Sequence, residues 1–317
     1  MKGIWLEDKQ LELKTDLPIP KPPLGESLVR VVRAGICNTD LELLRGYYPY
    51  TGIIGHEFVG IVEQGSDNLI NKRVVGEINA VCGQCRFCLS GQPTHCEKRS
   101  VLGIVNRSGA LAEYLTIPEA NLHPIPDNIT TDAATFTEPL AAALEIQEQV
   151  AIAPEARVLV VGDGKLGQLV AQTLALTGCD LLAVGRHTEK LEKLERKGIK
   201  VGFADLVKPK SFDIAVECTG NPQGFTLALQ GLRPRGTLVL KSTYAGNLTL
   251  DASALVVDEI TMIGSRCGPF VKALELLAKD QVDVTSLIET TYPLEQGLAA
   301  FDHAQQRGVL KVLVKMD

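Results

Sequence analysis

The fold is decided by one stretch, Val158-Leu159-Val160-Val161-Gly162-Asp163-Gly164-Lys165-Leu166-Gly167. Its four leading apolar residues predict a buried strand, and its glycines have the G-x-G-x-x-G spacing of a turn that opens a helix. Glycines at this spacing let the backbone approach a pyrophosphate, which then lies at the positive N-terminal end of the helix. The stretch therefore predicts the first strand and helix of a dinucleotide-binding domain.

The residues after this stretch continue the alternation of apolar strands, turns and amphipathic helices. Further strands are predicted at residues 181–184, 212–217, 237–240 and 260–263. Strands that alternate with helices form parallel sheets, and the dinucleotide-binding form has about six strands. We therefore predict a parallel α/β sheet in this half of the chain, with little sequence between the helix that ends near Gly198 and the strand at 212.

The first part of the chain has a different pattern. Short β-rich runs such as 27–32 and 57–63 alternate with glycine and proline, which predicts a small, irregular β-barrel-like domain. The run 308–315 predicts a last strand that returns to this domain. The predicted domains are a catalytic domain at 1–125, completed by 275–317, and a dinucleotide-binding domain at 126–274.

Composition places the chain among soluble globular proteins. It has 317 residues, of which 45% are hydrophobic and 22% charged, with a formal net charge of −6. This acidic balance, without a dense Lys/Arg stripe, argues against nucleic acid as a partner. There is no run of about 18 apolar residues, and Glu7 and Asp8 come too early for a signal peptide. We therefore expect a cytoplasmic protein of about two domains with a small-molecule partner and no membrane association.

Four cysteines form a tight cluster in the first domain. Their spacing is C-x2-C-x2-C-x7-C, and they are Cys82, Cys85, Cys88 and Cys96. In a reducing compartment, clustered thiols are better metal ligands than disulfide partners, and this spacing lets one loop wrap four thiolates around a zinc ion. Because such coordination leaves no open position, we predict a structural zinc site. The alternatives are free thiols or an iron–sulfur cluster, and His95 is interpreted as a solvated residue.

A second set of ligand types lies outside this cluster. It comprises Cys37, His56, Glu57 and Glu138. One thiolate, one imidazole and one or two carboxylates suit a zinc ion that keeps a position open for water or substrate. Taken singly, a cysteine is usually a small buried apolar residue and a glutamate a solvated charge. The combination predicts a catalytic zinc site.

Several short motifs of this sequence follow one another in the order in which they occur in a known protein family. The motifs are Cys37-Asn38-Thr39-Asp40, Gly55-His56-Glu57, the four-cysteine loop, Gly109-Ala110-Leu111-Ala112-Glu113-Tyr114, Glu138-Pro139-Leu140 and the glycine fingerprint. Over essentially its whole length the sequence resembles the zinc-containing, alcohol dehydrogenase-like medium-chain dehydrogenase/reductase superfamily, in particular its polyol, threonine and glucose dehydrogenase branch. The resemblance implies a GroES-like β-barrel catalytic domain and a Rossmann domain with a doubly wound parallel sheet. It also implies that Cys37, His56 and Glu57 bind the catalytic zinc, with Glu138 as a fourth ligand or linked to the metal through water.

The same resemblance implies an oxidoreductase that reversibly oxidises an alcohol, polyol or sugar hydroxyl to a carbonyl by hydride transfer. The zinc ion would act as a Lewis acid, and Thr39 matches the residue that begins the proton relay in relatives. Many relatives have histidine where this chain has Glu42, so a relay through Glu42 or directly through water is left open. Asp40 is expected to orient His56 by accepting its other ring proton. The predicted catalytic residues are Cys37, Thr39, His56 and Glu57.

The cofactor site extends from the glycine fingerprint to the ends of two further strands. The predicted contacts are Gly162, Gly164, Lys165, Leu166, Gly167, Gly185, Arg186, Thr219 and Gly220, the last two by resemblance. NAD-binding enzymes end their second strand with Asp or Glu, which binds the ribose hydroxyls, but this chain has Gly185 followed by Arg186. Without a carboxylate there, a 2′-phosphate is not repelled, and a guanidinium group can bind it. We therefore predict NADP as the preferred cofactor and NAD as a possible one; alternatively, Arg186 caps the next helix and both cofactors bind. Lys311 matches a basic residue that touches the pyrophosphate in relatives, although a surface lysine fits equally.

Two other functions fit the same residues. One is an NADPH-dependent aldehyde or ketone reductase, which uses the same groups in the opposite direction. The other is a non-catalytic zinc- and nucleotide-binding protein, against which an intact open metal site argues. The sequence does not identify the substrate, and by resemblance we expect a homo-oligomer, either a dimer or a tetramer.

Overall fold

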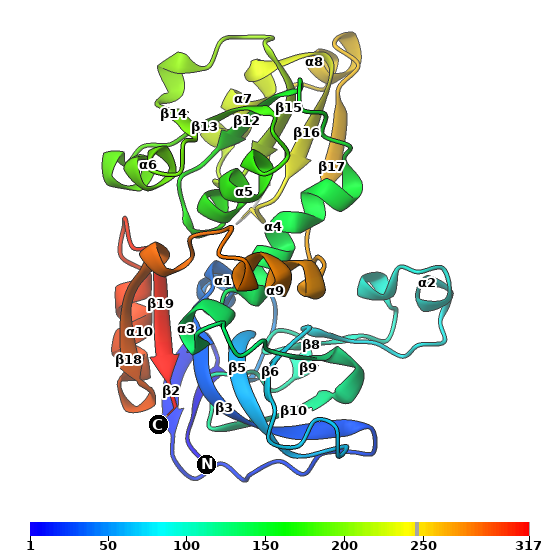
Figure 1. Ribbon diagram of the computed structural model, residues 1–317, viewed down its shortest axis with the longest axis vertical. Helices are drawn as coiled ribbons and strands as arrows, with labels where there is room; N and C mark the ends of the chain where they lie inside the picture. The colour runs from blue at the N-terminus through cyan, green and yellow to red at the C-terminus, as the bar shows by residue number, and fades with distance from the viewer. Residues whose placement is uncertain (245–246, 317) are drawn as a thin grey trace. The chain divides into compact units, whose positions relative to one another are not determined.

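The computed structural model describes residues 1–244 and 247–316 and divides the chain into two compact units (Figure 1). The first unit combines Met1–Glu138 with Phe270–Asp317, and the second is Pro139–Pro269. Along the chain, the second unit is therefore inserted into the first. Among the described residues, no helix has both the length and the apolar composition needed to cross a bilayer.

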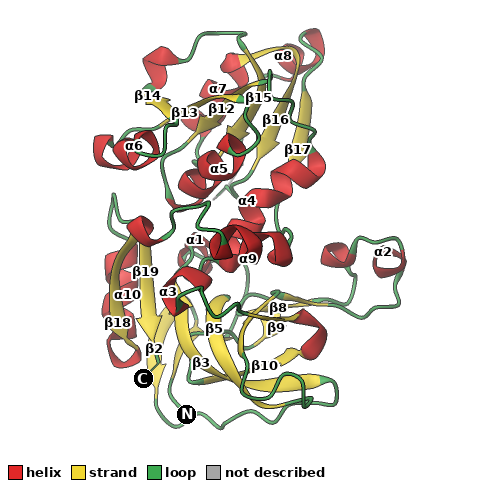
Figure 2. Cartoon of the chain, in the orientation of Figure 1, coloured by secondary structure: helices red, strands yellow, loops and turns green. Residues whose placement is uncertain are grey.

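The second unit is built on a six-stranded parallel sheet (Figure 2). Its strands lie in the order β14 (Lys200–Gly202), β13 (Asp180–Val184), β12 (Arg157–Val161), β15 (Phe212–Glu217), β16 (Leu232–Leu240) and β17 (Thr261–Gly264). Numbered along the chain, this is the 3-2-1-4-5-6 order of the Rossmann fold, which reverses direction at its first strand. The prediction of a doubly wound parallel α/β sheet is confirmed.

Helices link the strands of this sheet. Those that lie between successive strands are α5 (Lys165–Ala175), α6 (Thr188–Glu195), α7 (Pro222–Gly231) and α8 (Ala252–Val257). α4 (Thr137–Gln149) precedes β12 and contains the limit between the two units. The central strand β12 is almost wholly apolar because strands of a parallel sheet are covered on both faces, and Val158, Leu159 and Val160 are fully buried. α7 starts where its sequence predicts, since Pro222 occupies its first turn and the Asn221 side chain accepts the Gly224 N–H at 2.9 Å.

The first unit contains a seven-stranded sheet. Its members are β3 (Glu26–Gly35), β5 (Glu57–Gln64), β6 (Arg73–Gly76), β10 (Tyr114–Pro118), β11 (Leu122–Pro124), β18 (Ile288–Pro293) and β19 (Lys311–Lys315). β3 lies between β5 and β19, and it pairs with both in antiparallel fashion. The strand expected at 308–315 thus pairs with a strand near the start of the chain, and it packs with α10 (Gly297–Ala304) over a core that includes Ile36 and Phe301.

Among the described residues, the first unit also contains two smaller sheets and four further α-helices. They are β1 (Gly3–Glu7), β2 (Gln10–Lys14) and β4 (Gly52–Ile53); β7 (Asn79–Ala80), β8 (Ser100–Leu102) and β9 (Asn106–Arg107); and α1 (Asn38–Leu44), α2 (Arg86–Leu89), α3 (Thr131–Ala134) and α9 (Phe270–Ala278). The predominance of short strands agrees with the predicted small, irregular β domain.

Two details of the parallel sheet in the second unit differ from the sequence prediction. β14 was not expected, because a three-residue edge strand is too short to show a hydrophobic period. β16 begins at Leu232, earlier than the predicted Thr237, and Leu232 pairs with Phe212 before the register shifts. Between Leu232 and Thr237, Pro234 and the positive φ of 63° at Arg235 are typical of a turn, which is why no strand was predicted there.

Candidate functional site

The four clustered cysteines lie together in a loop of the first unit. The Sγ atoms of Cys82, Cys85, Cys88 and Cys96 all lie within 4.8 Å of one another, and none is in a disulfide. The Cys85–Cys88 and Cys82–Cys96 sulfur distances are both 3.5 Å. Zinc–sulfur bonds of about 2.3 Å place tetrahedral ligands roughly 3.8 Å apart. The four thiols therefore fit a four-thiolate zinc ion.

A short stem of two strands holds this loop. β7 and β8 pair as Asn79 with Val101 and Ala80 with Ser100, and α2 lies in the loop that joins them (Figure 1). The backbone N–H groups of Cys88 and Glu97 lower the pKa of Cys85 to about 6, whereas burial raises the pKa of Cys88 to about 11. The His95 ring lies 6.3 Å from the Phe87 ring, and His95 is not in the sulfur group.

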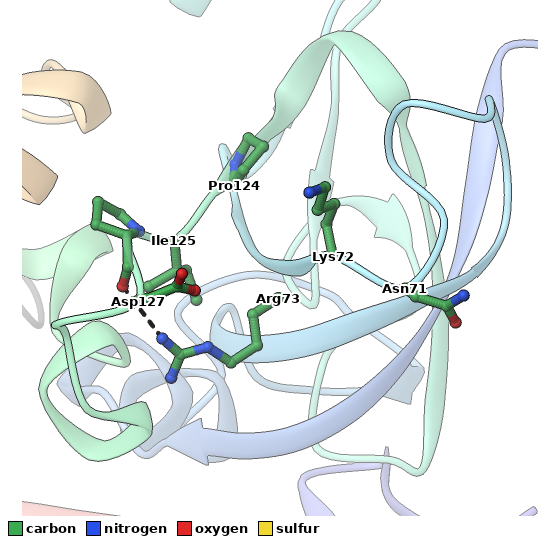
Figure 3. Close-up of a pocket in the computed structure, with 7 residues that line it drawn as sticks. Asn71, Lys72, Arg73, Pro124, Ile125 and Asp127 are labelled. Carbon is green, nitrogen blue, oxygen red and sulfur yellow. Dashed lines mark hydrogen bonds between the residues drawn. The ribbon is translucent and has the colours of Figure 1, made fainter.

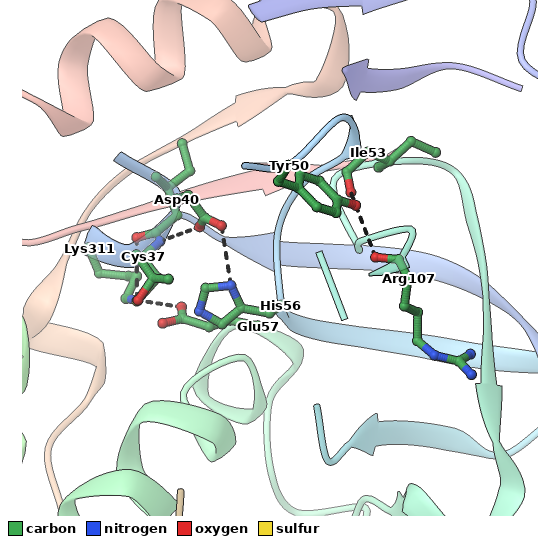
Figure 4. Close-up of polar contacts among 10 residues, drawn as sticks. Cys37, Asp40, Tyr50, Ile53, His56, Glu57, Arg107 and Lys311 are labelled. Atoms are coloured by element: carbon green, nitrogen blue, oxygen red, sulfur yellow. Dashed lines mark hydrogen bonds and ion pairs between the residues drawn. The ribbon is translucent and has the colours of Figure 1, made fainter. Parts of the chain in front are cut away.

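A second group of ligand types meets beside β3. Ligand atoms of Cys37, His56 and Glu57 lie within 4.8 Å of one another (Figure 4). Cys37 is the N-cap residue of α1, and His56 and Glu57 lead into β5. Glu57 pairs with Gly35 across the sheet, and a Cβ at Gly35 would lie 2.3 Å from the Glu57 Oε2 atom. The absence of a side chain at Gly35 therefore makes room for the carboxylate.

Asp40 connects two members of this group. Its Oδ2 accepts the backbone N–H of Cys37 at 2.8 Å, and its Oδ1 lies 3.2 Å from the His56 Nδ1 (Figure 4). Asp40 is fully buried and His56 is 3% exposed. This is the position expected for Asp40, because a carboxylate on Nδ1 leaves the other ring nitrogen, Nε2, to act as a ligand.

The charges around His56 determine its protonation in the absence of a metal. Burial lowers the pKa of His56, but the negative charges of Asp40 and Cys37 outweigh burial, and the net pKa is well above the usual value. A cation is therefore favoured among these groups. Among the described residues, the buried Oε1 atom of Glu57 has no hydrogen-bond partner, which is the state expected of an oxygen that serves as a metal ligand.

Lys311 completes the surroundings of Glu57. Its ammonium group donates to the Oε2 of Glu57 (Figure 4), and both residues are buried. The ring of Phe136 lies 5.6 Å from the ammonium nitrogen. Burial lowers the pKa of Lys311, but the charges of Glu57 and Cys37 raise it more. Lys311 is 2% exposed, so the interpretation as a surface lysine is wrong. Its place at the metal group was not predicted, because its one signal in the sequence is a lysine within an apolar run.

The other residues that the sequence prediction linked to the metal or to the proton relay are less closely grouped. The Thr39 Oγ1 lies 3.8 Å from the Cys37 Sγ. Glu138 is half-buried and lies outside the group of three ligands, although its charge acts on Lys311. Glu42 accepts a hydrogen bond of 2.6 Å from Arg45. The nearby Tyr50 hydroxyl lies 2.6 Å from the Ile53 carbonyl and 2.9 Å from that of Arg107, which fixes the loop before β4 (Figure 4).

The glycines of the second unit fit the three roles that a pyrophosphate loop requires. Gly162 has a φ of +123°, which only glycine adopts without strain. A Cβ at Gly164 would meet nothing within 4 Å, so the backbone is open to a ligand there. A Cβ at Gly167 would lie 2.0 Å from the Gly162 oxygen, so the first turn of α5 packs directly on the loop. Lys165 and Leu166 are the first two residues of α5.

The other predicted cofactor residues follow β13 and β15. Gly185 and the exposed Arg186 come directly after β13. Thr219 and Gly220 come after β15, and both of their backbone N–H groups donate to the buried Glu217 carboxylate. The carboxyl ends of neighbouring parallel strands meet at one edge of the sheet, so these residues and the glycine loop share that edge.

A separate hollow of about 470 Å³ lies on the first unit (Figure 3). It is lined by Asn71, Lys72, Arg73, Pro124, Ile125, Pro126 and Asp127. The Arg73 guanidinium donates to the carbonyls of Pro126 at 3.1 Å and Ile129 at 2.8 Å. None of the residues of the two metal groups lines this hollow, so it has no part in the candidate site.

Two family profiles match the chain, one in each part. The profile described as the alcohol dehydrogenase GroES-like domain matches residues 23–127, and the profile described as zinc-binding dehydrogenase matches residues 166–279. Both descriptions agree with the geometry of the ligand groups and with the Rossmann order of the second sheet.

Individual proteins are similar over nearly the whole chain. L-threonine 3-dehydrogenase of Chromobacterium violaceum is 28% identical over 93% of this chain and 94% of its own. A zinc-binding dehydrogenase of Sinorhizobium meliloti 1021 bound to NADP is 26% identical with a TM-score of 0.89, covering 99% of this chain and 98% of its own. An alcohol dehydrogenase of E. coli CFT073 complexed with NADH is 25% identical with a TM-score of 0.90, covering 100% of this chain and 99% of its own. The chain therefore belongs to the zinc-containing medium-chain dehydrogenase/reductase superfamily and is an oxidoreductase of the alcohol dehydrogenase type.

Proposed function

We propose that this protein is a zinc-dependent, NAD(P)-linked dehydrogenase that reversibly converts the hydroxyl of an alcohol, polyol or sugar to a carbonyl. The observation that carries the proposal is the buried group of Cys37, His56 and Glu57, whose ligand atoms lie within 4.8 Å of one another. Three protein ligands leave a zinc ion with an open position for substrate. The hydroxyl-bearing substrate of the threonine dehydrogenase relative supports the reaction class.

The residues around the ligands have separate roles in this proposal. A zinc ion held by Cys37, His56 and Glu57 would supply Lewis acidity to a substrate hydroxyl. Asp40 holds the His56 ring and the Cys37 backbone in place, and Thr39, next to the sulfur, takes the hydroxyl proton. Glu138 completes the ligand set directly or through water. Because the Glu42 carboxylate is paired with Arg45, the simpler route for the proton from Thr39 is directly to water.

The glycine loop would hold the dinucleotide. A nicotinamide would accept the hydride in the oxidation direction. Gly162, Gly164 and Gly167 let the α5 N-terminus face the pyrophosphate, with Lys165 and Leu166 in its first turn. Thr219 and Gly220 would lie toward the nicotinamide ribose.

The proposal includes two zinc ions for each chain, one catalytic and one structural. The four-cysteine loop would hold the structural ion, since four thiolates leave no open position. A reducing cytoplasmic location suits these thiols. A homodimer or homotetramer stays a prediction from the family resemblance.

The choice between NAD and NADP depends on the end of β13. The sequence favoured NADP because Gly185 and Arg186 stand where an acid is expected. The side chain of Asp163, however, brings a carboxylate to this strand end.

Metal analysis combined with turnover measurements tests the proposed function. The purified protein is assayed for reduction of NAD and NADP with polyols, sugars, threonine and simple alcohols, and for the reverse reaction with the corresponding carbonyls. We expect turnover that falls at least about a hundredfold in Cys37→Ser, with one zinc lost, and is unchanged in Cys179→Ser, whose half-buried sulfur lies near the Leu174 carbonyl. Full zinc loading and dinucleotide binding without turnover in either direction would instead support a non-catalytic protein.

A further inference from the structure

One carboxylate lies where the glycine loop meets the end of the second strand. Asp163 stands between the first two glycines, and its Oδ2 accepts the backbone N–H groups of Arg186 at 2.6 Å and His187 at 2.8 Å. The His187 Nδ1 lies 3.0 Å from the same oxygen. Since an ionised carboxylate only accepts hydrogen bonds, this ring nitrogen is the donor. Three donors therefore fix the Asp163 side chain, which is 9% exposed.

The position after β13 has no room for a side chain of its own. A Cβ at Gly185 would lie 2.3 Å from the Asp163 Oδ2 and 2.5 Å from the Asp163 Cβ. Asp163 thus fills the volume in which a strand-end side chain would start. In dinucleotide-binding sheets that side chain is the Asp or Glu that binds the ribose hydroxyls. This chain has a carboxylate at the same place, supplied by the glycine loop.

The surrounding backbone holds this arrangement together. The Gly162 N–H donates to the Val184 carbonyl at 2.8 Å, and the Gly185 N–H donates to Gly202 at 3.1 Å. The buried Gln168 side chain donates to the Lys190 carbonyl at 2.9 Å, which ties α5 to α6. The carboxylate is therefore part of a rigid junction between the loop and the strand end.

We propose that Asp163 takes the place of the strand-end acid and makes this chain select NAD over NADP. The inference rests on the proposed function, because it requires a dinucleotide at the glycine loop. Two effects act against a 2′-phosphate: Asp163 already occupies the N–H groups of Arg186 and His187, and its negative charge repels the phosphate. A ribose 2′-hydroxyl can instead donate to Oδ1, since each carboxylate oxygen has two lone pairs.

Asp163 carries its charge at neutral pH. Burial raises the pKa of Asp163, but the N–H groups of Arg186 and His187 lower it more, and the net pKa is below the usual value. The positive charge of Arg186 is on an exposed side chain, where solvent weakens its attraction for a phosphate. The buried acid therefore outweighs the exposed base in this site.

Binding of cofactor fragments tests the proposal without any turnover. ADP-ribose and 2′-phospho-ADP-ribose differ only in the phosphate, and both lack nicotinamide. Titration calorimetry of the unmodified protein is expected to give a dissociation constant for ADP-ribose at least about tenfold lower than for its 2′-phosphate. This first comparison requires no variant, so it does not depend on a substitution being tolerated.

Two charge-removing variants then test whether the selectivity between the two fragments comes from Asp163. Asp163→Asn keeps the shape of the side chain and removes its charge, and we expect the ratio of the two dissociation constants to move at least about tenfold toward the 2′-phosphate. Glu189→Gln removes the same charge from an exposed side chain in the first turn of α6, and its ratio is expected to stay within about twofold.

A double variant moves the carboxylate back to the strand end. In Asp163→Gly with Gly185→Asp, the emptied loop position leaves space for the new side chain, and the preference for ADP-ribose should return relative to Asp163→Gly alone. Equal binding of both fragments by the unmodified protein, tighter binding of the 2′-phosphate, or an unchanged ratio in Asp163→Asn would each overturn the role of Asp163. Failure of the unmodified protein to bind either fragment would overturn the dinucleotide part of the proposed function as well.

Discussion

The ammonium group of Lys311 is buried against the carboxylate of Glu57, which precedes it by 254 residues in the chain. The two residues stand on β19 and β5, and β3 lies between these strands in the sheet. On β3, Gly35 pairs with Glu57, and any side chain at Gly35 would collide with the Glu57 carboxylate. The glycine on β3 therefore leaves the space in which the Glu57 carboxylate of β5 meets the Lys311 ammonium group of β19.

Removal of the Lys311 charge should destabilise the metal-free protein. Lys311→Met keeps much of the side-chain volume but leaves the buried Glu57 carboxylate without its cation, at an expected cost of about 3–5 kcal/mol in the free energy of unfolding. Denaturant unfolding after chelation measures this. Lys315→Met, on the exposed end of the same strand, should change stability by less than about 0.5 kcal/mol. Zinc should reduce the loss in Lys311→Met, and an equal loss with and without zinc would contradict the placement of the metal beside Glu57.

Loss of one thiol from the four-cysteine group should remove one zinc ion and leave the other. Cys85→Ser breaks a four-thiolate site, so we expect zinc content to fall from two to one per chain and protease sensitivity to rise between Cys82 and Cys96. Elemental analysis and limited proteolysis measure these effects. Cys179→Ser should retain both ions. Retention of both ions in Cys85→Ser would show that this loop is not a metal site.

Neutralisation of Asp40 should weaken metal binding without removing a ligand. In Asp40→Asn the His56 ring loses its carboxylate partner, and we expect zinc affinity at the catalytic site to fall about 10–100-fold. Competition with a chelating dye measures the affinity. Asp67→Asn, which removes the same charge from an exposed loop, is the control. Equal affinities in the two variants would mean that Asp40 only caps α1.

A methyl group at Gly185 should strain the junction that Asp163 forms. Gly185→Ala forces its Cβ into the Asp163 side chain, and overpacking of this kind costs about 1–3 kcal/mol. In the Asp163→Gly background the cost should largely disappear. A double-mutant cycle in urea measures the coupling, and additive effects would be inconsistent with the contact.

The contribution of Asp163 to stability should depend on pH. Its pKa is lower in the folded chain than the usual 3.8, so the unfolded chain takes up the proton first. The stabilisation is therefore fully present above about pH 4 and is lost as pH falls through the folded-state pKa. The difference in unfolding free energy between the unmodified protein and Asp163→Asn should be larger at pH 7 than at pH 3. A difference that is constant over this range would contradict the hydrogen bonds to the ionised side chain.

The sequence predicted those features that short-range patterns encode. The apolar run before Gly162 predicts a strand, and the glycine spacing that follows it has a known physical role. The spacing of the four cysteines is enough by itself to predict a loop that can bind a metal. Lys311 and Asp163 could not be placed in this way. Lysine is usually exposed, so only the β3–β19 pairing reveals that Lys311 is buried with Glu57. The direction of the Asp163 side chain depends on loop geometry, which the letters G-D-G do not specify.

The Glu57–Lys311 pair also sets an order of events during synthesis. At a translation rate of roughly 5–20 residues per second, Lys311 follows Glu57 by roughly 10–50 s, and all of the second unit is made in between. For that interval the nascent chain carries Cys37, His56 and Glu57 without the lysine that later neutralises the carboxylate. β19 also pairs with β3 beside Gly35, so the strand that supplies the ammonium group is the last part of this sheet to be made.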